Sequence, residues 1–189
     1  GARVDGALTM LKIAIVLFVV IVGFFYVKAE NFTPFIPPSE PATATGSGLA
    51  ATMEQPLWQW ATGMTPSIYG IAGIISGAAL VFFAFLGFDV VATTSEETVN
   101  PKKNVPLGIG VGMGLIIVLY TLVAIVTTGM VSYKDLAKQK DPSLATAFEM
   151  VGADWAAKII SFGIVIGLAT VVMVLLLGLT RVVFAMSRD

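Results

Sequence analysis

The chain has 189 residues, of which 57% are hydrophobic and only 12% are charged, and its mean hydropathy is +0.91. Soluble domains are roughly 45–50% apolar and about 25% charged, so the composition predicts an integral membrane protein. The net charge of −1 gives no electrostatic basis for nucleic-acid binding, and the absence of Cys and His excludes disulfides, thiolate nucleophiles, histidine metal sites and histidine proton relays.

Four apolar segments are long enough to cross a bilayer as helices. A hydrocarbon core of about 30 Å requires about 20 mostly apolar residues, and the segments at about residues 8–28, 68–94, 105–131 and 157–187 meet this requirement. The expected fold class is therefore all-α integral membrane, with four transmembrane helices. Because the first residue is Gly1 and no signal peptide precedes the first apolar run, residues 1–189 are expected to be a fragment of one transmembrane domain.

Two loops are expected on one face of the membrane. The segment between the first two spans is rich in Pro, Ser, Thr and Gly, and the segment at residues 132–158 alternates charged and apolar residues, which predicts one or two short helices. Four spans bring both chain ends to the opposite face. Lys and Arg are divided evenly between the two faces, so their distribution does not indicate which face is cytoplasmic. Aromatic residues gather on the loop face, at Tyr26, Trp58, Trp60, Tyr69, Tyr133 and Trp155.

The motif FFAFLGFDVVATTSEETVNPKKNVPLGI (residues 82–109) joins a glycine-interrupted apolar segment to a polar connector. A helix broken at residues 83–87 would expose carbonyl and N–H groups, two opposite partial charges that suit a zwitterion. A single membrane glycine more often serves close packing, and Asp89 is more simply a cap of the second half-helix than a proton carrier. The candidate substrate-binding residues are Phe83, Ala84, Phe85, Leu86 and Gly87.

Lys12 is the basic residue placed well inside a span, about four residues after its expected start. Two interpretations have similar weight. A long cationic side chain can reach back to the nearer membrane surface, or it can face the interior of a helix bundle, where burial disfavours the charge and allows proton exchange. The glycines at residues 108–114 and at Gly163 and Gly167 predict close helix packing rather than phosphate binding, since no strand precedes them.

Three segments resemble the amino acid permeases of the amino acid, polyamine and organocation superfamily, most closely the bacterial relatives of the cationic amino acid transporters. ARVDGALTMLKIAIVLFVVIVGFFYVKAENFTPFIP (residues 2–37) is similar to the fifth helix and its loop, residues 82–109 to the sixth helix and its connector, and GLTRVVFAMSRD (residues 178–189) to the end of the eighth. The resemblance implies two inverted five-helix repeats, of which this chain holds the last helix of one and the first three of the other.

The resemblance also implies functional roles. The face with both chain ends is expected to be cytoplasmic in a multi-pass bacterial plasma membrane protein. Main-chain carbonyls of Phe83, Ala84 and Leu86 are expected to bind the substrate α-amino group, and Phe83 to act as a gate. Lys12 matches a fifth-helix lysine that stands where sodium-coupled relatives hold an ion, which implies coupling to a proton. The partners are then an amino acid, a proton, the lipid bilayer and the remaining helices of the parent transporter, and no cofactor is expected.

The leading hypothesis is amino acid transport, coupled to protons, by alternating access around a broken sixth helix. The alternative is a non-transporting membrane amino acid sensor with the same fold, which the long insert at residues 38–67 would favour. An intramembrane enzyme is disfavoured because the sequence offers no nucleophile, metal cluster or paired buried acids.

Overall fold

The computed structural model describes residues 2–41, 61–63, 67–82 and 100–187. Its helices are α1 (Ala2–Phe24), the 3-10 helix η1 (Ala29–Phe32), α4 (Gly70–Phe82), α6 (Pro101–Met130), α7 (Tyr133–Ala137), α8 (Leu144–Met150) and α9 (Asp154–Met186), and its strands are β1 (Glu40–Pro41) and β2 (Ser67–Ile68). The expected all-α membrane fold class is confirmed, whereas the expected number of four transmembrane helices stays a prediction. The chain forms two units, residues 1–32 with 87–189 and residues 33–86, which are described separately.

Three of the described helices are long and apolar enough to cross a membrane. Their candidate spans are Gly6–Phe24, Pro101–Met130 and Asp154–Thr180, with mean hydropathies of 2.7, 2.6 and 2.8. Of the predicted second span at residues 68–94, residue 68 belongs to β2, α4 covers residues 70–82, and residues 83–94 lie outside the described residues. Helix α1 begins at Ala2, six residues before the expected span, because hydropathy marks the apolar part of a helix and not its polar first turn.

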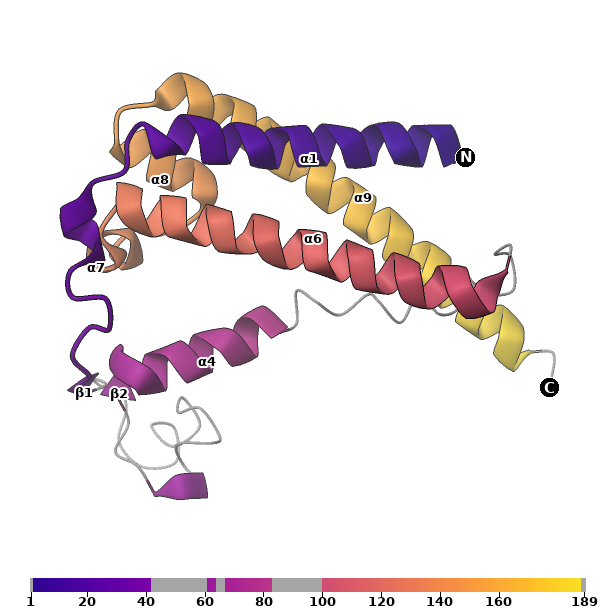
Figure 1. The fold of residues 1–189 in the computed structure, drawn as a ribbon, viewed down its shortest axis with the longest axis horizontal. Helices are drawn as coiled ribbons and strands as arrows, with labels where there is room; N and C mark the ends of the chain where they lie inside the picture. The colour runs from indigo at the N-terminus through magenta and orange to yellow at the C-terminus, as the bar shows by residue number, and fades with distance from the viewer. Residues whose placement is uncertain (1, 42–60, 64–66, 83–99, 188–189) are drawn as a thin grey trace. The chain divides into compact units, whose positions relative to one another are not determined.

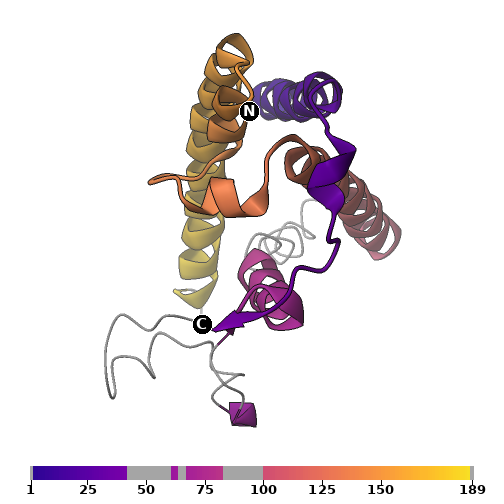
Figure 2. The same ribbon diagram turned by 90° about the vertical axis from the view of Figure 1, so that its left-hand side faces the viewer.

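In the first unit, α1 packs against both α6 and α9, and α9 runs in the opposite direction to the other two (Figure 1). The C-terminal ends of α1 and α6 and the N-terminal end of α9 lie together with η1, α7 and α8, at what we call the loop end. Figure 2 shows this end facing the viewer. The predicted short helices of the second loop are confirmed as α7 and α8.

The buried core of this unit lies at the loop end. Its largest fully buried side chains are Phe148 of α8, Ile160 of α9 and Val19 of α1. Small residues allow the close approach of α8 to α9; the buried alanines are Ala145, Ala147, Ala153, Ala156 and Ala157. Helix α8 is therefore part of the core rather than a surface helix, and the Ser143 hydroxyl caps it by accepting a hydrogen bond from the Thr146 N–H at 3.1 Å.

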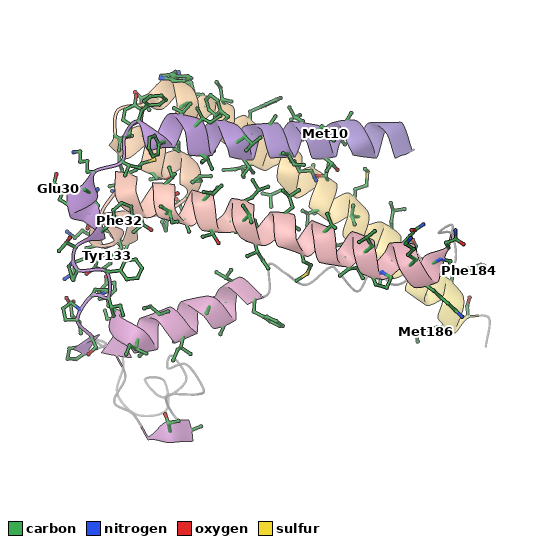
Figure 3. All side chains as sticks on the ribbon, viewed as in Figure 1. Met10, Glu30, Phe32, Tyr133, Phe184 and Met186 are labelled. Carbon is green, nitrogen blue, oxygen red and sulfur yellow. The ribbon has the colours of Figure 1, made fainter. Side chains whose placement is uncertain are left out.

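Away from the loop end, the long helices expose large apolar side chains, such as Met10 of α1 and Met186 of α9 (Figure 3). A water-soluble monomer rarely exposes contiguous apolar surface of this extent. The exposed faces of α1, α6 and α9 are those expected of helices that meet lipid or further helices.

The second unit holds a two-stranded antiparallel ladder followed by α4. Glu40 pairs with Ile68, and Pro41 pairs with Ser67. Gly70 follows at once with a φ of 61°, and a Cβ added to it would lie 3.0 Å from the Cβ of Ser39. The left-handed backbone and the close contact both favour glycine where α4 begins.

Candidate functional site

The predicted substrate-binding residues Phe83, Ala84, Phe85, Leu86 and Gly87 lie outside the described residues. Helix α4 is described up to Phe82, immediately before them. The break in the sixth helix therefore stays a prediction.

Lys12 lies in the N-terminal half of α1. It is ten residues from the first residue of α1 and six residues from Gly6, where the candidate span begins.

Lys12 belongs to the packed face of α1. Leu8, Lys12, Ile15 and Val19 recur at spacings of four, three and four residues, and all are at least partly buried. The opposite face carries exposed apolar residues, which include Met10, Leu17 and Ile21. Lys12 thus lies in the stripe that faces α6 and α9.

Ile15, one turn after Lys12, packs closely against Gly163 of α9. A Cβ added to Gly163 would lie 2.7 Å from Ile15 Cδ1 and 2.9 Å from Ile15 Cγ2, so the predicted packing role of Gly163 is confirmed. Gly167 has no atom within 4 Å of its Cβ position among the described residues, and the same holds for the four glycines at residues 108–114. Their packing role stays a prediction.

The polar surroundings of this interface are sparse. Among the residues that the structure describes, no carboxylate pairs with the Lys12 ammonium. Thr170 of α9 is buried, and its hydroxyl donates to the carbonyls of Ile166 at 3.0 Å and Gly167 at 2.8 Å. The sequence reasoning missed Thr170, because a threonine in an apolar helix carries no sign of the side that it faces.

A cavity of about 560 Å³ opens at the loop end, between the segment after α1 and the end of α6. It combines apolar and polar groups; its lining comprises Phe25, Tyr26, Val27, Lys28, Glu30, Asn31, Met130, Val131, Ser132, Asp135, Met150 and Val151. Asp135 forms an ion pair with Lys138 at 3.1 Å, but both groups are largely exposed, so the pair adds little stability. This cavity could not be predicted from the sequence, since its lining comes from three segments that are far apart along the chain.

Metal binding has no support in the described ranges, where no three His, Cys, Asp or Glu side chains gather. Lys12 lies one turn from the close contact between Ile15 and Gly163.

Comparison with known proteins identifies the family. A family model described as amino acid permease matches residues 1–189. The chain is 40% identical over 189 residues to the methylthioribose transporter of Bacillus subtilis (strain 168), which covers 100% of this chain and 34% of that protein. It is 36% identical over 187 residues to the branched-chain amino acid permease BcaP of the same organism, which covers 99% of this chain and 33% of that protein.

A human relative, cationic amino acid transporter 4, is 33% identical over 193 residues, which covers 100% of this chain and 26% of that protein. The chain thus spans between about a quarter and a third of the length of these curated relatives. All three names describe transporters or permeases rather than enzymes, and the apolar helices fit a multi-pass membrane protein. On the match over its whole length, the chain belongs to the amino acid permease family.

Proposed function

We propose that the complete protein that contains this chain transports an amino acid across the cell membrane, and that Lys12 couples this transport to a proton. The observation that carries the proposal is the family match over all 189 residues, together with relatives that are named as transporters. These names differ in substrate, because they specify methylthioribose, branched-chain amino acids and cationic amino acids. Uptake tests therefore include all three solute classes.

The proposed site is a break in the sixth helix at residues 83–87. Two half-helices present carbonyl groups from one end and N–H groups from the other, and these partial charges complement the ammonium and carboxylate of an amino acid. Backbone groups without helical partners are tolerated in a membrane only where protein or a water-filled cavity satisfies them. Alternating access then exposes this one site to each side of the membrane in turn, with Phe83 as a gate.

The position of Lys12 supports its role in proton coupling. A charge in the bilayer interior costs roughly 2.5–3.5 kcal/mol on insertion scales, and Lys12 lies on the packed face of α1 rather than on the exposed one. Lysine can act as a proton carrier in proteins, whereas arginine stays charged. Protonation would change the charge between α1 and α9 and so favour one conformation over the other.

The test uses the complete protein in proteoliposomes with an imposed pH gradient. We expect wild-type protein to accumulate an amino acid, and Lys12→Ala and Lys12→Arg to abolish pH-driven accumulation while one of them retains substrate exchange. The control is Lys158→Arg, because exposed Lys158 lies near the start of α9 and can reach the membrane surface. Full pH-driven uptake by Lys12→Arg would reject proton coupling through Lys12. Specific amino acid binding without uptake by wild type would favour the sensor function instead.

A separate test addresses the break. Gly87→Val should obstruct the non-helical backbone and abolish uptake, and Phe83→Ala should raise the apparent KM or cause a leak. Gly77→Val is the matched control, because Gly77 lies in α4 with no described atom within 4 Å of its Cβ position. Normal uptake by both Gly87→Val and Phe83→Ala, at normal expression, would place the substrate site elsewhere.

A further inference from the structure

The segment after α1 is hydrogen-bonded to the end of α6. The carbonyl groups of the last helical turn lack partners within their own helix. The Gly129 carbonyl accepts two hydrogen bonds from the segment after α1, one from the Lys28 backbone N–H at 2.9 Å and one from the Asn31 side-chain amide at 2.7 Å. We call these two bonds, with the glycine contacts that accompany them, the Gly129 clasp.

Two glycines let the segments interlock. A Cβ added to Gly129 would lie 2.7 Å from Val27 Cγ1 and 2.8 Å from Phe32 Cζ. A Cβ added to Gly23 of α1 would contact Val126, and would lie 2.8 Å from Met130 Sδ, both of α6. Each segment therefore inserts side chains into a notch that a glycine of the other segment provides.

The clasp is continuous with the buried core at the loop end. Phe148 of α8 is fully buried, and its Cζ lies 3.3 Å from the Cβ position of Gly23. Val126 and Met130 are each 3% exposed. For α1 to slide along α6 here, side chains would have to leave both notches and the Gly129 carbonyl would lose both donors. Closely packed interiors resist such gradual deformation.

We propose that the end of α1, η1, the end of α6, α8 and the start of α9 move as one body during transport, so that a displacement of α1 that begins at Lys12 reaches α6 through the Gly129 clasp. This inference rests on the proposed function, because it requires a transport cycle. The other end of α6 differs, since it contains Pro106 within the helix and four glycines without described contacts. Movement of α6 against its neighbours is expected there.

The decisive experiment closes the clasp covalently in the complete protein. The chain has no cysteine, so Val27→Cys with Gly129→Cys introduces one defined pair. The Cβ atoms of a disulfide are about 3.5–4.5 Å apart, and the contact of 2.7 Å between the Gly129 Cβ position and Val27 Cγ1 brings the pair within this reach. A protease site inserted between the two cysteines reports the disulfide, because the cleaved halves stay joined until reduced.

We expect the disulfide to form under mild oxidation with no loss of the initial rate of pH-driven uptake. Loss of uptake on oxidation, restored by dithiothreitol, would overturn the inference, because the clasp would then have to open in each cycle. An active protein that forms no disulfide would also overturn it. These results are distinct from failure of the proposed function, which would appear as absent uptake by wild-type protein.

A second set of variants applies if the reduced cysteine pair is inactive. Asn31→Ala removes one donor to the Gly129 carbonyl, and Asn31→Asp places a second acceptor beside it. We expect both to lower the ratio of pH-driven uptake to substrate exchange by about tenfold. Lys28→Ala is the control, because the clasp uses only the backbone N–H of Lys28. An unchanged ratio in both Asn31 variants would overturn the inference, since a merely structural role lowers both activities by the same factor.

Discussion

Gly163→Ala tests the close contact between Gly163 of α9 and Ile15 of α1. The added methyl carbon would lie 2.7, 2.9 and 3.4 Å from Cδ1, Cγ2 and Cγ1 of Ile15. Carbon atoms in favourable contact are about 3.5–4.0 Å apart. Rotation about χ2 of Ile15 can move Cδ1 away but leaves Cγ2 in place. The remaining conflict requires the two helices to separate by several tenths of an ångström.

The expected cost follows from two opposing effects. Overpacking a close contact costs typically about 1–3 kcal/mol, whereas replacing a glycine in a helix by alanine gains roughly 0.5–1 kcal/mol. Gly163→Ala should therefore lower the free energy of unfolding by about 0–2.5 kcal/mol. Gly167→Ala is the matched control, because the Gly167 Cβ position has no described neighbour within 4 Å. Gly167→Ala should show only the stability gained by replacing a helical glycine. The free energies of unfolding of the two variants should therefore differ by about 1–3 kcal/mol.

The measurement is the free energy of unfolding of the complete protein in mixed detergent micelles. A double-mutant cycle with Ile15 identifies the contact as the cause. Ile15→Val removes Cδ1 but keeps both γ carbons, so it should relieve Gly163→Ala only in part. Ile15→Ala removes all three atoms and should relieve it fully. Equal stability of the Gly163→Ala and Gly167→Ala proteins, or no coupling to Ile15, would refute the close approach of α1 and α9.

Three further predictions concern the loop end and the topology. Phe148→Ala should lower the free energy of unfolding by about 3–5 kcal/mol, because Phe148 is fully buried; Phe148→Leu should lose less, and equal losses would contradict the packing described. Ser143→Ala should cost about 1 kcal/mol through loss of the cap on the Thr146 N–H, while Ser143→Asp should retain most of the stability. A cysteine at Asn104 should be labelled only from the cytoplasm and one at Ser47 only from outside, so labelling of both from one side would refute the four-span topology.

Apolar length and turn composition predicted the fold class and three of the long helices well. The same signals failed at helix ends, because the polar first turn of α1 continues a helix that hydropathy does not detect. The short helices of the second loop were predicted, but not that Ala145, Ala147 and Phe148 of α8 are buried in the core. Periodicity in a helix of only seven residues is too short to show which neighbour will cover it.

The sequence indicated a candidate site residue only where the residue type is unusual for its segment. Lys12 stood out because a charge is unusual in an apolar helix, but its face could be assigned only when Ile15 was seen against Gly163. No unusual residue in the sequence indicated the Gly129 clasp. Asn31 and Gly129 are 98 residues apart, and a single sequence does not reveal contacts at that separation.

The long sequence separation between α1 and its partners α6 and α9 affects how α1 is inserted into the membrane during synthesis. Helix α1 leaves the ribosome before α6 and α9 exist, so Lys12 must first enter the bilayer without its packing partners. Insertion of a central lysine costs roughly 2.5–3.5 kcal/mol. The span Gly6–Phe24 also contains twelve Leu, Ile, Val and Phe residues, each of which contributes roughly −0.3 to −0.6 kcal/mol at the centre of a helix. Their sum offsets the cost of the lysine, so α1 can stay inserted before α9 arrives and covers its packed face.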